Sequence, residues 1–231
     1  MDQAILMIRN PRRAMPSYMT MRHELGFSGS WESSFGRKDF VYTERPNVTT
    51  WEVWRDTLFE REMDLWGWFI EFWMEGGMRR NDGNGQPYQE ENCQTLLDCF
   101  PKAVISYENI MDETNGADEM AKLAAVLEGH EADGLTLIDS IAYGCMYDEV
   151  LNQREKHNNS EFKLNKHREG ISSSEFHFTL PQLRAMEIEL QRLYQKYNLE
   201  TRATAVDLST NLQAYIEEVQ TEISLIEAGI E

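Results

Sequence analysis

Hydrophobic residues along the chain fall into two short apolar runs and several helical repeats. The runs at 5–8 and 103–106 are four residues long and end at polar positions, which predicts two short buried strands, the second parallel to the first. Apolar residues recur at a spacing of three and four over 49–74, 117–129 and 183–226, which predicts helices there. The pattern therefore predicts a protein that combines strands with helices.

Turn-forming and capping residues locate the boundaries of these elements. Proline fixes its own φ and disfavours helix in the residue before it, so Asn10-Pro11 predicts a strand-to-helix junction. Asn47 or Thr49 is suited to cap the tryptophan-rich helix that follows, which we expect to be a structural part of the core. Thr179 is a suitable N-cap for a helix that opens at the next residue.

Composition indicates a folded, acidic protein. The 231 residues include six Trp, ten Phe and nine Tyr, which supply apolar area for a core although 27% of the residues are charged. The net charge of −18 argues against nucleic acid and anionic membranes as partners, because both attract basic surfaces. The best apolar stretch, 65–74, contains Glu71 and is too short to span a bilayer. We therefore expect one domain or slightly more, without a membrane span in this chain.

Cysteine and histidine positions do not indicate a metal centre. No cluster of Cys and His has the spacing of metal ligands, so we expect no metal cofactor. The three cysteines do not make a disulfide framework. Cys93 and Cys99 either pair in an oxidising compartment or stay reduced, and the sequence leaves both states open.

The end of the first strand carries residues suited to a phosphate. Arg9 stands at the strand end, and Ser17 follows eight residues later beside a helix N-terminus. A guanidinium, a hydroxyl and free helix N–H groups outside a strand's carboxyl end together suit a phosphate. The alternative is an ordinary strand followed by an arginine-rich helix start. In an acidic chain the site needs a local basic pocket, for which six residues are available: Arg9, Arg12, Arg13, Lys166, His167 and Arg168.

Three segments resemble the cofactor-binding motifs of sulfotransferases, which use 3′-phosphoadenosine 5′-phosphosulfate (PAPS). Residues 9–18 fit R-[DN]-P-x5-S-Y, and residues 107–110 fit Y-E-[DN]-L/I. Residues 168–182 are similar to R-K-G-x-x-G-x-W-x-x-x-F-T-x-x-Q. The resemblance implies that Tyr107 contacts the adenine. It also implies that four residues bind the 3′-phosphate: Arg9, Ser17, Arg168 and Gly170.

The chain departs from the family pattern in two places. Glu169 replaces a basic residue, and the second glycine and the tryptophan of the third motif are absent. In the family, a phosphosulfate-binding loop with a lysine precedes the first strand, and no segment here fits such a loop. We therefore expect a sulfotransferase-type fold that is incomplete at its N-terminus.

The resemblance implies an α/β fold with three layers, in which helices cover both faces of a parallel sheet of the P-loop-like type. Residues 1–195 correspond to the latter two-thirds of a sulfotransferase domain, and 196–231 form an acidic amphipathic helical tail. The apolar face of 205–228 either packs back on the domain or makes a contact with another copy or a partner.

The function implied by the resemblance is transfer of a sulfuryl group from PAPS to a hydroxyl or amine of an acceptor, such as a carbohydrate or a protein. His23 and Glu24 either line the acceptor cleft or lie on the surface, and the catalytic base is unassigned. Two alternatives stay open: an inactive relative that binds at most the 3′-phosphoadenosine half of PAPS, and a non-enzymatic acidic helical interaction module. An upstream anchor would place the protein in the Golgi lumen; otherwise we expect it in the cytoplasm.

Overall fold

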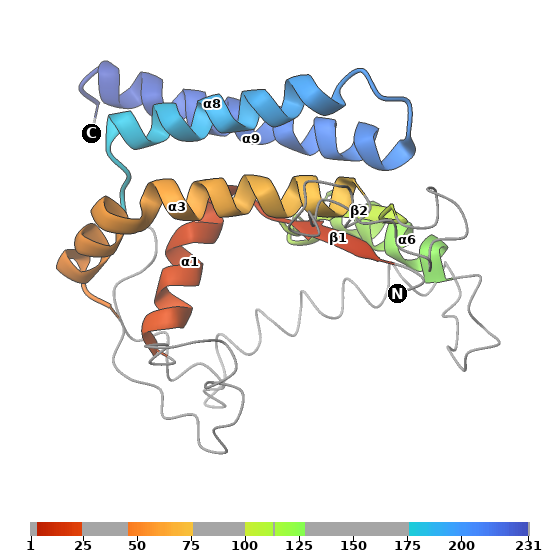
Figure 1. Ribbon diagram of the computed structural model, residues 1–231, viewed down its shortest axis with the longest axis horizontal. Coiled ribbons are helices and arrows are strands. Elements are labelled where there is room, and N and C mark those ends of the chain that lie inside the picture. The colour runs from red at the N-terminus through yellow and green to blue at the C-terminus, as the bar shows by residue number, and fades with distance from the viewer. Residues whose placement is uncertain (1–3, 25–45, 76–99, 113, 128–175, 231) are drawn as a thin grey trace, which may run out of the picture.

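The computed structural model describes five stretches of the chain: 4–24, 46–75, 100–112, 114–127 and 176–230. Within them the chain is a mostly helical α/β structure with a small parallel sheet (Figure 1). Its elements in chain order are β1 (Ile5–Ile8), α1 (Pro11–Glu24), α3 (Val48–Met74), β2 (Ala103–Ser106), α5 (Tyr107–Ile110), α6 (Gly116–Leu127), α8 (Leu180–Tyr197) and α9 (Ala203–Glu227). None of the helices in these stretches is long and apolar enough to cross a membrane.

The two strands predicted from the apolar runs pair in parallel. Ile5 lies opposite Ala103, and Ile8 lies opposite Ser106. All four residues of β2 are buried, whereas β1 buries alternate residues and leaves Ile5 and Met7 exposed. The prediction of two parallel strands is confirmed, but the prediction that β1 is buried throughout is wrong, because only one of its faces meets the core.

The junction between β1 and α1 lies where the sequence places it. Helix α1 begins at Pro11, and the fully buried Asn10 closes its first turn. The carbonyl of Asn10 accepts from the backbone N–H groups of Arg13 and Ala14, at 2.9 and 2.7 Å. Its side-chain Oδ1 accepts from the N–H of Arg12 at 3.0 Å. Asn10 therefore acts as the N-cap of α1.

Helix α3 forms the centre of the core. Its N-cap is Asn47, whose Oδ1 accepts from the Thr50 backbone N–H at 2.8 Å, so the first of the two predicted caps is the one used. Trp51 is fully buried, stacks on Phe176 at 5.2 Å between ring centroids, and donates its indole N–H to the His177 carbonyl at 3.1 Å. The predicted structural role of this tryptophan-rich helix is confirmed.

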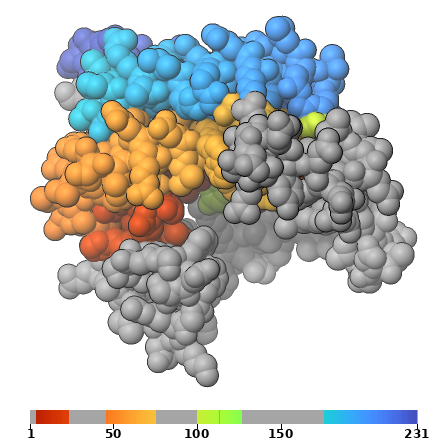
Figure 2. Space-filling model, in the orientation of Figure 1, coloured from red at the N-terminus to blue at the C-terminus, as the bar shows by residue number. Residues whose placement is uncertain are grey.

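Helices α8 and α9 lie side by side and form a layer over α3 (Figures 1 and 2). The predicted cap of α8 is present: the Gln182 Oε1 accepts from the backbone N–H of Thr179 at 2.9 Å. Helix α8 continues to Tyr197 and so runs across the boundary predicted between residues 195 and 196. The buried side chains of α9 belong to the same core as those of α8 and α3: Ala205, Leu208, Leu212, Tyr215, Ile216, Val219 and Ile223. The apolar face of 205–228 thus packs back on its own domain, which is the first of the two alternatives given for it above.

Tyr215 fastens α9 to the carboxyl end of β2. Its hydroxyl lies 3.2 Å from that of Ser106 and donates to the Glu108 Oε2 at 2.9 Å. The backbone N–H of Ser106 donates to the buried carboxylate of Glu119 at 2.5 Å. Burial, with the nearby charge of Glu108, raises the pKa of Tyr215 well above its usual value. Tyr215 is therefore a neutral donor that links the last helix to the strand end.

Replacing Tyr215 by Phe should lower the free energy of unfolding by about 1–3 kcal/mol, because buried polar groups of Ser106 and Glu108 lose their partner. Urea denaturation followed by circular dichroism measures this change. Tyr18→Phe is the control, since the Tyr18 side chain is exposed and its hydroxyl meets Arg22 only weakly, at 3.4 Å. Equal stability of the two variants would contradict the role of Tyr215.

An ion-pair network joins α3 to α8. The carboxylate of Glu71 accepts from Arg192 Nη1 at 2.9 Å and from Lys196 Nζ at 2.6 Å. Burial opposes the charge of Glu71, but the hydrogen bonds from the two cations outweigh it and lower the pKa of Glu71 to about 2. Lys196 also pairs with Glu75, next to the C-terminal end of α3.

The lowered pKa of Glu71 makes the stability of the fold dependent on acid. Because the folded pKa of about 2 lies below the ordinary 4.5, this stabilisation is complete above pH 4.5 and is lost as the pH falls through 2. Glu71→Gln should therefore cost up to about 3 kcal/mol at pH 7 and much less at pH 2. Urea unfolding at both pH values, with Glu52→Gln on the exposed face of α3 as control, tests this; a cost that does not change with pH would refute it.

Candidate functional site

The parallel pairing of β1 with β2 brings Arg9 beside Tyr107. Arg9 directly follows Ile8, and Tyr107 directly follows Ser106. Ile8 and Ser106 lie opposite one another in the sheet. The guanidinium carbon of Arg9 lies 4.6 Å from the centroid of the Tyr107 ring, a cation–π contact. The side chain of Arg9 is 33% exposed and Tyr107 is 37% exposed, so both are accessible from solvent. Two residues that the sequence assigns to one site thus meet in the structure.

The other three predicted site residues are not seen in this contact. Ser17 is half-buried on α1, about 9 Å along the helix from Pro11 at 1.5 Å per residue. Arg168 and Gly170 lie outside the described residues, as do Lys166 and His167 of the expected basic pocket.

A carboxylate occupies the space between the strand ends and α1. The Glu108 Oε2 accepts from the backbone N–H of Asn10 at 3.2 Å as well as from Tyr215. Its Oε1 lies 3.6 Å from the Arg9 Nε, longer than a hydrogen bond. Among the described residues, both of these atoms are buried without a hydrogen-bond partner. Arg9 therefore faces a charge partner but keeps an unused donor at the strand end.

The start of α1 holds a second carboxylate, which comes from α9. Glu218 Oε1 accepts from Arg12 Nη1 at 3.1 Å and from Arg13 Nε at 2.9 Å. Its Oε2 accepts from the Asn10 Nδ2 at 3.0 Å. Glu222, one turn further along α9, pairs with Arg12 Nε. The hydrogen bond to Glu218 raises the pKa of Arg13, although burial opposes it. These donors at a helix N-terminus make an arrangement that binds an anion.

The acidic partners of the arginines are the part of the site that the sequence analysis missed. Four polar residues of α9 lie on one helix face and meet α5, the end of β2 or the start of α1: Asn211, Tyr215, Glu218 and Glu222. Their spacing of four, three and four residues is that of a single helix face. This polar stripe beside the apolar one was the available signal, and it indicated a face that meets polar groups inside the protein.

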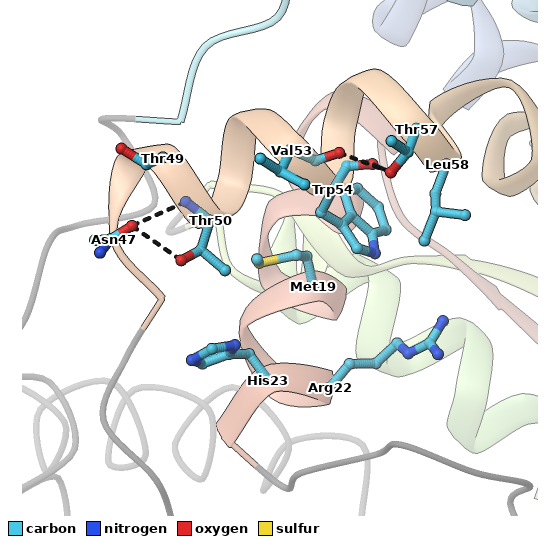
Figure 3. A pocket seen from close by; sticks show the side chains of 10 residues that line it. All are labelled: Met19, Arg22, His23, Asn47, Thr49, Thr50, Val53, Trp54, Thr57 and Leu58. Carbon is cyan, nitrogen blue, oxygen red and sulfur yellow. Dashed lines mark hydrogen bonds between the residues drawn. The ribbon is translucent and has the colours of Figure 1, made fainter.

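A pocket of about 710 Å³ lies between the C-terminal half of α1 and the N-terminal half of α3 (Figure 3). It is lined by Met19, Arg22, His23, Asn47, Thr49, Thr50, Val53, Trp54, Thr57 and Leu58. His23 lines this pocket and is exposed, which agrees with its predicted placement on the surface, and a role in an acceptor cleft stays a prediction; the side chain of Glu24 is outside the described part. The pocket is remote from Arg9, because His23 stands about 18 Å along α1 from Pro11.

No group of three or more His, Cys, Asp or Glu side chains in the described stretches is arranged to hold a metal ion. The site at the strand ends is instead built from arginines, an asparagine, a tyrosine and their carboxylate partners. Its chemistry is that of anion recognition beside an aromatic ring. In comparisons with known proteins, the chain matches no family model, no curated protein and no solved structure.

Proposed function

We propose that this chain is a PAPS-dependent sulfotransferase that binds its cofactor at the carboxyl ends of β1 and β2. The single observation that carries the proposal is the contact of Arg9 with Tyr107 at 4.6 Å, which unites two of the three motifs. In this proposal the chain has the three-layer sulfotransferase-type fold, in which helices cover both faces of the sheet. Arg168, Gly170 and Ser17 complete the phosphate site.

The chemistry of the strand ends supports a nucleotide with a phosphate on its ribose. Tyr107 is 37% exposed and offers its ring to the adenine, and the Arg9 guanidinium, whose side chain is 33% exposed, offers positive charge to the phosphate. The site lies outside the carboxyl ends of parallel strands, where open α/β sheets bind their ligands. A nucleotide 3′-phosphate fits this combination of ring and cation.

The proposed reaction moves the sulfuryl group between two oxygens, or from oxygen to nitrogen. The acceptor hydroxyl or amine attacks the sulfur of PAPS while the bond from sulfur to the phosphate oxygen breaks. Adenosine 3′,5′-bisphosphate leaves with that electron pair, and the acceptor proton passes to a general base. Cations near the transferring group stabilise its charge. The acceptor is a carbohydrate or a protein, and no described residue is assigned as the base.

A second candidate is a non-catalytic relative that binds only the 3′-phosphoadenosine half of PAPS. The observation that favours it is the pairing of Arg9, Arg12 and Arg13 with carboxylates of the same chain. These pairs leave less positive charge for a sulfate in transfer than free arginines would. Sulfuryl transfer from PAPS to a panel of glycan and tyrosine acceptors distinguishes the two candidates, because only the first gives turnover.

Calorimetric titration with adenosine 3′,5′-bisphosphate tests the site shared by both candidates. Arg9→Ala should weaken binding at least tenfold, because a charge-assisted hydrogen bond contributes about 1.5–3 kcal/mol. Arg168→Ala should have a similar effect. Arg184→Ala is the matched control, since Arg184 is an exposed arginine of α8 that pairs with Glu227.

Three results would contradict the proposal: no binding by the folded chain, binding that Arg9→Ala leaves intact, or an equal loss in Arg184→Ala. Circular dichroism of each variant excludes unfolding as the cause of a loss. Failure of the folded chain to bind, together with self-association of the intact chain in sedimentation experiments, would favour the interaction-module interpretation.

A further inference from the structure

The start of α1 already binds an anion that the protein itself supplies. The carboxylate of Glu218 receives three hydrogen bonds, from the Asn10 amide and from the guanidinium groups of Arg12 and Arg13, at 2.9–3.1 Å. The three donors come from Asn10 and two residues of the first turn of α1, and the acceptor comes from a helix about 200 residues further along the chain. A phosphate oxygen would find the same donors here.

Glu218 is more exposed to solvent than the other two carboxylates of the cluster, Glu222 and Glu108. Its side chain is 27% exposed, whereas that of Glu222 is only 7% exposed. Glu108 is fixed further by the backbone N–H of Asn10 and by Tyr215. The Glu218 side chain can therefore turn toward solvent while α9, held by its buried apolar face, stays in place.

We propose that Glu218 is an internal competitor of the ligand phosphate and thereby a specificity-determining residue of the site. This inference rests on the proposed function, since it concerns the anion that the strand ends bind. A ligand phosphate bound at Arg9 gains Arg12 and Arg13 as further donors only by displacing the Glu218 carboxylate. A phosphomonoester carries about −1.5 to −2 charges near neutral pH, against one on the carboxylate, so it can displace Glu218. A singly charged group has no such advantage.

The consequence is selection for a nucleotide with a phosphate at the 3′ position of its ribose. Adenosine 3′,5′-bisphosphate carries such a phosphate, whereas adenosine 5′-phosphate has a hydroxyl at that position. The carboxylate of Glu218 returns to its donors when the ligand leaves, so the buried amide of Asn10 regains its partner. The contact of Glu218 with its donors thus excludes weaker anions and also keeps these donors in position when no ligand is bound.

Glu218→Gln separates this role from a structural one. The glutamine keeps the size of the side chain but removes its charge, so adenosine 3′,5′-bisphosphate should bind about tenfold more tightly than to the original chain, by calorimetry at fixed salt. Adenosine 5′-phosphate should bind the variant and the original chain equally. Glu217→Gln is the matched control: Glu217 is the exposed neighbour that accepts from Gln213, and its loss changes the net charge by the same amount.

An unchanged or weaker affinity in Glu218→Gln, with binding by the original chain, would overturn the inference and assign Glu218 to positioning Arg12 and Arg13. An equal gain in Glu217→Gln would overturn it too, because the effect would then be one of net charge. Absence of binding in both the original chain and Glu218→Gln would overturn the proposed function together with the inference. Glu218→Asp, which keeps the charge one methylene further from the arginines, should give an intermediate gain and serves if the glutamine variant does not fold.

Discussion

The hydrogen bond from Tyr215 to Glu108 is the interaction on which the rest of the site depends. Strand β2 is buried along its whole length, so the polar groups at its end need partners inside the protein. Tyr215 supplies a neutral donor there and fixes the rotation of α9 about its own axis. Once that rotation is fixed, Glu218 and Glu222 face α1 and the apolar side chains of α9 face the core.

The acidic composition of the chain has a local meaning at this site. A protein with a net charge of −18 can keep a group of arginines together without repulsion, because carboxylates of the same chain lie between them. The described arginines of the expected basic pocket are all paired in this way: Arg9, Arg12 and Arg13. The site is therefore not a bare positive surface, and the proposed ligand would have to replace a carboxylate there.

Local signals in the sequence predicted most of the described elements, but they could not predict contacts between residues far apart in the chain. Proline at position 11 and the cap at Asn47 act within one turn of helix, so their effect can be inferred from neighbouring residues alone. The meeting of Arg9 with Tyr107 required a resemblance that supplied the order of the motifs, because two strands can pair in several registers. The polar stripe of α9 indicated that Glu218 meets polar groups, but its particular partner Asn10 had no local signal, since the contact depends on how α9 packs against α1.

Stability and ligand binding draw on the same contacts at the start of α1. The hydrogen bonds of Glu218 to Arg12 and Arg13 close α9 onto α1, and in the proposed function a phosphate must break them to bind. Under that proposal, removing the carboxylate favours the ligand but takes one hydrogen-bond partner from Arg12 and Arg13 in the empty protein. Glu71, which joins α3 to α8 far from any proposed ligand contact, carries no such conflict. The cluster at α1 is thus the place where greater stability and tighter binding cannot be reached by the same substitution.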